Sequence, residues 1–175
     1  MIIRSERLPD RPAILRLNRE AFGGEGEAEL IERLGADGLI AASLVAEDEG
    51  RIIGHILLSW LGLEMDGRRL RGLALAPMAV APGHQRQGTG SRLVAAAIEA
   101  ARPIGAEAII VLGHPGFYPR FGFSAQTAAS LAGPFTGEAF MALELIRGAL
   151  AGQAGSVLYP AAFGLEPHGE ATTSL

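Results

Sequence analysis

An almost wholly apolar segment, residues 70–80, constrains the fold of this chain more than any other feature of its sequence. A run of this length and composition is typical of a strand that is buried on both faces. It leads directly into a glycine-containing turn, residues 82–90, and a helical pattern follows from Ser91 to Arg102. The sequence therefore predicts a strand, a turn and a helix in immediate succession.

The predicted turn has the composition of an anion-binding site. Consecutive backbone N–H groups in such a turn, with the first N–H groups of a helix, form a cradle for phosphate. Gly88 and Gly90 have no Cβ atom, so a phosphate can approach the main chain closely. Arg86 and Arg92 add positive charge beside it. An ordinary strand-to-helix connection also contains glycines, so the two glycines alone leave both interpretations open.

Composition excludes several classes of site. All 15 basic residues are arginine, so neither a P-loop lysine nor a Schiff-base lysine exists. The dinucleotide fingerprint requires Gly or Ala where this chain has Leu93. The chain has no cysteine, and no cluster of His, Asp and Glu has the spacing of a metal site, so we expect no metal. A net charge of −4 argues against a nucleic-acid-binding protein.

The rest of the chain predicts a mixed sheet with helices on its faces. A length of 175 residues with 49% hydrophobic content suits one folded domain. Helical patterns follow Asp10 and Glu25, and turn signals lie at residues 47–50 and at Asp66-Gly67. We expect one domain over residues 1–163 and a flexible polar tail over residues 164–175. With no leader or membrane segment recognised, we expect a cytoplasmic protein.

Two short motifs resemble those of one enzyme family. Gln85-Arg86-Gln87-Gly88-Thr89-Gly90 resembles the Gln/Arg-x-x-Gly-x-Gly/Ala signature of the GNAT superfamily of N-acetyltransferases, in the same place between a strand and a helix. Residues 117–123, Phe-Tyr-Pro-Arg-Phe-Gly-Phe, resemble the Tyr-x-x-x-Gly-Phe segment of that family. Residues 113–123 and 159–164 are similar to a bacterial subgroup of acetyltransferases. The order of expected elements fits the family from residue 2 to residue 159.

The resemblance implies a fold, a cofactor and a site. The fold is α/β (α+β), with a mixed, mostly antiparallel central sheet of about six to seven strands flanked by helices. The cofactor is acetyl-CoA, from which an amine takes the acetyl group by direct attack. The family places Tyr118 as general acid for the departing thiolate, although an aromatic residue packed beneath the cofactor is the alternative. The implied cofactor-binding residues are Met78, Ala79, Val80, Gln85, Arg86, Gln87, Gly88, Thr89, Gly90 and Ser91.

The proton acceptor for the amine is not identified by the sequence. His55 would face opposite Gly54 and Ile56 in a strand, either toward an acceptor cleft or as a hydrogen-bonded core histidine. Acidic residues open the second helix, where they bind a cationic acceptor, relay a proton, or simply suit the helix dipole. They are Glu25, Glu27 and Glu29. His84 and His114 are expected in exposed loops, and Phe117, Phe121 and Phe123 in the core.

Two functions therefore remain open at this stage. The first is an acetyltransferase that acts on a small-molecule or peptide amine, with neither nucleic acid nor membrane as a partner. The second is a non-catalytic acyl-CoA-binding or regulatory domain that keeps the phosphate cradle without turnover. The family's habit also indicates a homodimer. The sequence does not name the acceptor amine.

Overall fold

One sheet of eight strands runs through the structure, a computed structural model that describes residues 1–165. Helices lie against this sheet, and short 3-10 turns connect several elements. The strands and helices are β1 (Ile2–Ser5), α1 (Arg11–Phe22), α2 (Gly26–Ala36), β2 (Ile40–Asp48), β3 (Arg51–Met65), β4 (Arg68–Val80), α3 (Thr89–Ala101), β5 (Ala108–Leu112), β6 (Leu131–Ala132), β7 (Phe140–Glu144) and β8 (Gly155–Leu158).

Two tight hairpins set the register of the central strands. The β2–β3 and β3–β4 connections are two-residue loops, Glu49-Gly50 and Asp66-Gly67. All four residues have positive φ, from 47° at Glu49 to 78° at Gly67. This is the conformation of type I′ turns, whose twist matches that of the strands they join. Both turns lie where the sequence predicts them.

The strand order is β1-β2-β3-β4-β5-β7, with β6 and β8 beside the far end of β3. Along the main path every neighbouring pair is antiparallel except β4 and β5. These two strands run parallel, and α3 makes the crossover between them. The mixed, mostly antiparallel sheet that the sequence predicts is confirmed, and its strands include the two-residue β6, for which the sequence carries no signal.

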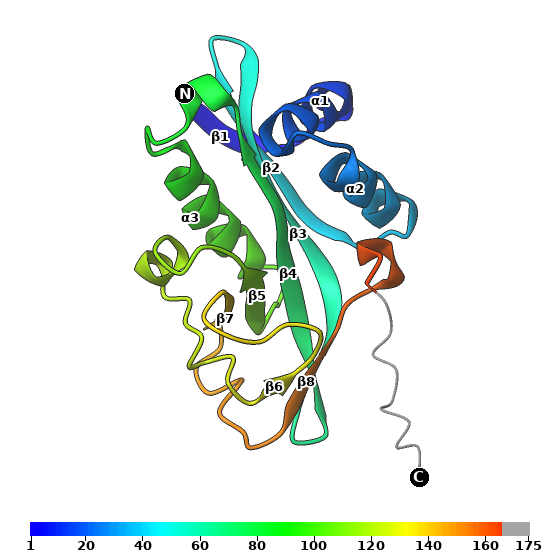
Figure 1. The fold of residues 1–175 in the computed structure, drawn as a ribbon, viewed down its shortest axis with the longest axis vertical. Helices are drawn as coiled ribbons and strands as arrows, with labels where there is room; N and C mark the ends of the chain where they lie inside the picture. Colours follow the sequence, from blue (N-terminus) through cyan, green and yellow to red (C-terminus); the bar gives the residue numbers. More distant parts are fainter. Residues whose placement is uncertain (166–175) are drawn as a thin grey trace.

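Helices cover both faces of the sheet (Figure 1). On one face α3 packs Leu93 and Ala97 against Ile56 and Leu73 of the central strands. On the other face α1 and α2 bury Ile14, Ile31 and Leu34 against Val45 and Leu57. A third cluster continues this second face toward the C-terminal segments, and it includes Leu61, Ala74, Ile110 and Val157. The sheet is therefore the layer between two hydrophobic cores.

The predicted C-terminal tail, residues 164–175, lies outside the described residues apart from Gly164 and Leu165. Within residues 1–165, no helix has the length and apolar character required to cross a membrane.

Candidate active site

The sheet opens where β4 and β5 separate. β5 pairs with β4 only through residues 72–74, so residues 75–80 of β4 have a partner on one side only, strand β3. Between the Leu58–Leu75 pair and the Ile56–Met78 pair, β4 has two residues where β3 has one. This is a β-bulge, which bends the strand, and Pro77 sits within it because it has no N–H to place in the ladder. The result is a free strand edge.

Beside this edge lies a cavity of about 600 Å³, which we call the turn cavity. Its wall is formed by the end of β4, the turn after it, the first residues of α3 and the segment around Tyr118. Two side chains hold the turn: Gln85 Nε2 donates to Val80 O, and Gln87 Nε2 donates to Gly83 O, each over 3.1 Å. Arg86 and Arg120 bring positive charge to the lining.

The main chain of the turn has unused hydrogen-bond donors. Within residues 1–165, no backbone N–H of residues 85–91 donates to a backbone carbonyl. The first such bond of α3 is from Arg92 N to Gly88 O, at 3.1 Å. Gly88 has a φ of +87°, and a Cβ atom there would meet no atom within 4 Å. A helix N-terminus with free N–H groups and an open approach is suited to bind an anion.

The free edge of β4 offers further donors. Ala81 N donates to Ile53 O of β3 over 2.8 Å. In an antiparallel ladder, alternate residues turn their N–H groups toward the same partner strand. Ala79 therefore directs its N–H to β3, whereas Met78 and Val80 direct theirs to the free edge. Extended backbone lying along this edge could thus pair with Met78 and Val80.

Most of the predicted cofactor-binding residues line the turn cavity, and three do not. The lining includes Met78, Val80, Gln85, Arg86, Gly88, Gly90 and Ser91. The side chains of Ala79 and Thr89 are buried, at 3% exposure each, and Gln87 is held against Gly83. Arg92 also lies outside the lining, where its guanidinium donates to Met1 O over 3.3 Å.

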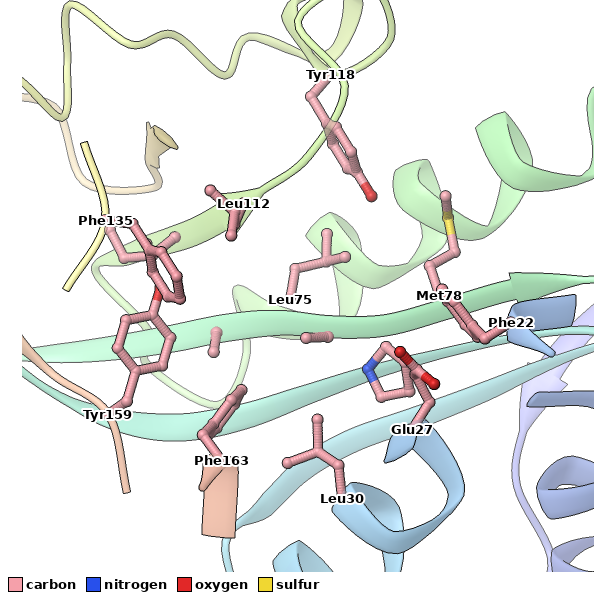
Figure 2. Close-up of a pocket in the computed structure, with 14 residues that line it drawn as sticks. Phe22, Glu27, Leu30, Leu75, Met78, Leu112, Tyr118, Phe135, Tyr159 and Phe163 are labelled. Carbon is pink, nitrogen blue, oxygen red and sulfur yellow. The ribbon is translucent and has the colours of Figure 1, made fainter. Parts of the chain in front are cut away.

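A second cavity, of about 310 Å³, lies at the bulge and is called here the aromatic cavity (Figure 2). Residues of the bulge line it, and Glu27 and Leu30 of α2 enter from one side. On another side Phe135, Tyr159 and Phe163 form a row, with ring centroids 5.6 Å and 5.0 Å apart and edge-to-face geometry. Both tyrosines of the chain, Tyr118 and Tyr159, line this cavity.

Tyr118 and Met78 line both cavities, so they mark the junction between them. Figure 2 shows the Tyr118 ring entering from above, with its hydroxyl directed into the cavity. The ring packs edge-on against Phe117 and Phe123, with centroids 5.0 Å and 5.6 Å away. Burial raises the pKa of the Tyr118 phenol to about 12. Tyr118 therefore keeps its proton at neutral pH and can donate it or hydrogen-bond at the junction.

Gly113 sets the position of the Tyr118 ring. A Cβ atom at residue 113 would overlap the ring, 2.7 Å from its Cδ2 atom. Any larger residue would push the ring away from the junction. Neither Gly113 nor the aromatic row was identified as part of the site by sequence reasoning. The similarity of residues 113–123 and 159–164 to a bacterial subgroup does not reveal these roles, because each role depends on a residue elsewhere in the structure.

His55 is a core residue. It has no exposed surface, and its Nδ1 and Nε2 atoms lie 3.3 Å from Asn18 Nδ2 and 3.0 Å from Ser43 Oγ. Burial lowers the pKa of His55 to about 3, so the ring is neutral at physiological pH. It lines neither cavity. Of the two alternatives for His55, the hydrogen-bonded core histidine is confirmed.

The three acidic residues at the start of α2 differ in their surroundings. Glu25 pairs with Arg19 at 2.6 Å, and Glu29 pairs with Arg33 at 3.0 Å. Glu27 is half-buried, lines the aromatic cavity, and has no ion-pair partner within residues 1–165. Glu27 is thus the acidic residue that the fold brings to the site.

Among the remaining candidates, His114 is exposed and Phe123 is buried as expected, whereas His84 and Phe117 are intermediate in exposure. His114 is exposed and lines the turn cavity, where its Nδ1 accepts from Gly116 N over 3.2 Å. His84 lies in the short turn after β4 and is half-buried. Phe123 is a core residue at 1% exposure, whereas Phe117 is partly buried and also lines the turn cavity.

Comparison with known proteins shows the family of the chain. A family model described as "Acetyltransferase (GNAT) domain" matches residues 40–125. The Escherichia coli (strain K12) protein named uncharacterized N-acetyltransferase YhbS is 35% identical over 162 residues, which cover 91% of this chain and 96% of that protein.

Two solved structures are similar to this chain in fold and in sequence over nearly its whole length. The crystal structure of YhbS from Escherichia coli in complex with CoA superposes with a TM-score of 0.83 at 34% identity, covering 94% of this chain and 92% of that one. The structure of a GNAT family acetyltransferase from Brucella melitensis in complex with acetyl-CoA has a TM-score of 0.76 at 30% identity, with coverage of 93% and 97%.

Proposed function

The chain belongs to the GNAT family of acetyltransferases, and on this premise we propose that it transfers an acetyl group from acetyl-CoA to an amine bound in the aromatic cavity. It is an N-acetyltransferase, as its relatives are named. One observation carries the assignment of the site. Within residues 1–165 the backbone N–H groups of residues 85–91 have no backbone acceptor, and five of these seven residues line the turn cavity.

The turn cavity fits the phosphates of CoA. Free main-chain N–H groups and a helix N-terminus stabilise a diphosphate by charge-assisted hydrogen bonds. Arg86 and Arg120 line the same cavity, where their positive charges balance the negative charge of the diphosphate. CoA and acetyl-CoA are the ligands of the two similar structures, which supports the same cofactor here. We assign phosphate binding to residues 85–91.

Acetyl-CoA supplies the thioester whose carbonyl carbon the amine attacks. The free edge of β4 leads from the turn cavity to the junction. An acetyl-CoA molecule whose extended arm paired with the main chain of Met78 and Val80 would therefore bring its thioester to the junction. The N–H groups on this edge also suit the stabilisation of negative charge on the carbonyl oxygen. They act through the main chain, so the side chains at these positions are not restricted by this role.

We assign to Tyr118 the role of giving its proton to the sulfur atom that leaves. An acceptor that arrives as an ammonium ion first gives one proton to the solvent, because only the neutral amine can attack. A C–N bond then forms, the C–S bond breaks, and the nitrogen loses a second proton while the thiolate gains one. The phenol of Tyr118 is protonated at neutral pH and lies at the junction. A positioned acid contributes about 10²–10⁴-fold in rate. The amine approaches from the aromatic cavity, on the other side of Tyr118.

The function is tested by thiol release from acetyl-CoA in the presence of amines. We expect release that depends on both acetyl-CoA and an acceptor, together with stoichiometric binding of CoA in calorimetry. Binding of CoA without acceptor-dependent release over a broad panel of amines would support the alternative, a non-catalytic acyl-CoA-binding domain. Absence of CoA binding would contradict the assignment of the turn cavity.

Three further expectations stay predictions. We propose a single domain over residues 1–163, supported by one sheet that includes strands from residue 2 to residue 158. A cytoplasmic location and a homodimer rest on the sequence and on the family's habit. Gel filtration with light scattering measures the oligomeric state directly.

A further inference from the structure

The aromatic cavity restricts what kind of amine the protein can accept. Resting on the proposed function, we infer that the acceptor is a primary monoamine on a compact, uncharged aromatic body, whose ammonium group binds Glu27. The inference uses the charge, the shape and the size of the cavity. The charge comes from Glu27 and the aromatic wall from Phe135, Tyr159 and Phe163, none of which lines the turn cavity.

The charge of the cavity comes from one side chain. Among the lining residues within 1–165, Glu27 is the only one with an acidic or basic side chain besides the two tyrosines. Glu25 and Glu29, its neighbours on α2, are neutralised by Arg19 and Arg33. In Figure 2 the Glu27 carboxylate enters the cavity from the side of α2, whereas the Tyr118 hydroxyl enters from the opposite side. An ammonium group held by Glu27 therefore lies between α2 and the junction where the thioester is expected.

The wall of the cavity favours an aromatic body. Phe135, Tyr159 and Phe163 stack edge-to-face along one side, and the buried residues Leu75 and Ile110 also line the cavity. A ring inserted beside this row makes further edge-to-face contacts, which stabilise aromatic pairs beyond the burial of area alone. An aliphatic polar chain would gain no such contact.

The same wall disfavours additional charges. In the described part of the chain no arginine or histidine lines this cavity, so a carboxylate on the acceptor would be desolvated close to Glu27 without a cation. A second ammonium group would be desolvated against the aromatic row, where the described residues provide no second carboxylate to pair with it. Amino acids and polyamines are thus excluded as favoured acceptors.

The size agrees with a single ring. A volume of about 310 Å³ lies at the small end of the range for sites that bind small molecules. Phenethylamine, a ring with a two-carbon arm and one primary amine, matches the chemistry of the cavity. Its arm separates the ring from the ammonium group, and in Figure 2 the aromatic row and Glu27 likewise lie apart in the cavity.

The first test compares phenethylamine with phenylalanine, which carries an additional carboxylate, and with spermidine, an aliphatic polyamine without a ring. Each binds to the protein saturated with CoA, which cannot react, and calorimetry gives the dissociation constant. We expect phenethylamine to bind at least tenfold more tightly than phenylalanine and at least tenfold more tightly than spermidine. Equal or tighter binding of either of the other two, or no binding of phenethylamine, would overturn the inference.

The second test isolates the ion pair at Glu27. Glu27→Gln should weaken phenethylamine binding about tenfold or more and leave phenethyl alcohol, its uncharged analogue, within about twofold. Glu29→Gln, on the same helix but paired with Arg33 outside the cavity, is the matched control and should change neither. An equal loss for both ligands, or no loss for the amine, would overturn the role of Glu27.

These outcomes are separable from failure of the proposed function. Failure to bind CoA contradicts the assignment of the turn cavity, and therefore the proposed function, but it does not favour a different class of acceptor. Intact CoA binding with acetyl transfer preferring spermidine or phenylalanine leaves the proposed function in place and overturns the acceptor class.

Discussion

The turn cavity and the aromatic cavity meet at Met78 and Tyr118, yet they are built in different ways. The turn cavity comes from one continuous stretch, residues 78–120, and its anion-binding groups are main-chain N–H donors. The aromatic cavity draws side chains from α2 and from segments after residue 130. The family model matches residues 40–125 and so includes the first region but not the outer parts of the second.

This difference explains what a shared fold can specify. Main-chain recognition needs a particular backbone path and a few residues that permit it, so it can accompany the fold wherever the fold occurs. Side-chain recognition depends on the residue at each position, and it changes without change in the fold. The cofactor therefore follows from the family, whereas the acceptor must be inferred from the residues of this chain.

The largest expected effect comes from blocking the turn. In the Gly88→Val, Gly90→Val variant, side chains occupy the approach to the N–H groups, and the φ of +87° at residue 88 disfavours valine. Loss of two hydrogen bonds to a charged group, each contributing about 1.5–3 kcal/mol, predicts at least about a 100-fold weaker affinity for CoA. Calorimetry measures the affinity, and circular dichroism confirms that the variant is folded.

Gly83→Val is the matched control for the turn. Gly83 lies in the same loop, has open space around its Cβ position, and does not line the turn cavity. We expect it to bind CoA like the wild type. Normal CoA binding by a folded Gly88→Val, Gly90→Val variant would show that the cradle has been assigned to the wrong residues.

The next largest effect concerns the junction. Tyr118→Phe keeps the ring that packs on Phe117 and Phe123 but removes the hydroxyl. We expect kcat to fall about 100-fold, as for loss of a general acid, with little change in the CoA dissociation constant. Steady-state thiol release and calorimetry give the two quantities. A kcat equal to that of the wild type would show that Tyr118 packs in the site without acting as general acid.

A smaller effect is expected from Gly113→Ala, which disturbs the junction through the Tyr118 ring. The added methyl group overlaps the Tyr118 ring, so overpacking should lower the free energy of unfolding by about 1–3 kcal/mol and reduce kcat about tenfold. Urea denaturation and steady-state kinetics measure these changes. Gly116→Ala is the control, because its Cβ atom would lie 3.4 Å from the nearest atom, His114 Nδ1. Equal behaviour of the two variants would argue against Gly113 as the residue that positions Tyr118.

The smallest effect lies in the aromatic wall. Phe163→Ala removes one ring of the row and should raise the KM for an aromatic amine about fivefold, through lost contact and packing. The CoA dissociation constant should not change, since Phe163 does not line the turn cavity. Leu158→Ala, an exposed residue on the adjacent β8 strand, is the control. A weaker affinity for CoA in Phe163→Ala would mean that the two cavities are not independent.

The two cavities also differ in how far the sequence predicts them. The strand, turn and helix of residues 70–102 are visible because apolar runs, glycines and helical spacing are local signals. The bulge before Met78 depends on how β4 pairs with β3, and the aromatic row depends on residues that meet only after β8 is placed. The choice of Glu27 over Glu25 and Glu29 depends on the rotation of α2 against the sheet.

The most direct test of the account is a crystal structure of the protein with CoA and phenethylamine bound together. We expect the diphosphate within hydrogen-bond distance of the backbone N–H groups of residues 85–91. The CoA sulfur should lie beside the Tyr118 hydroxyl, and the amine nitrogen should face Glu27. A diphosphate bound away from that turn, or a sulfur atom that does not reach the junction of the two cavities, would contradict it.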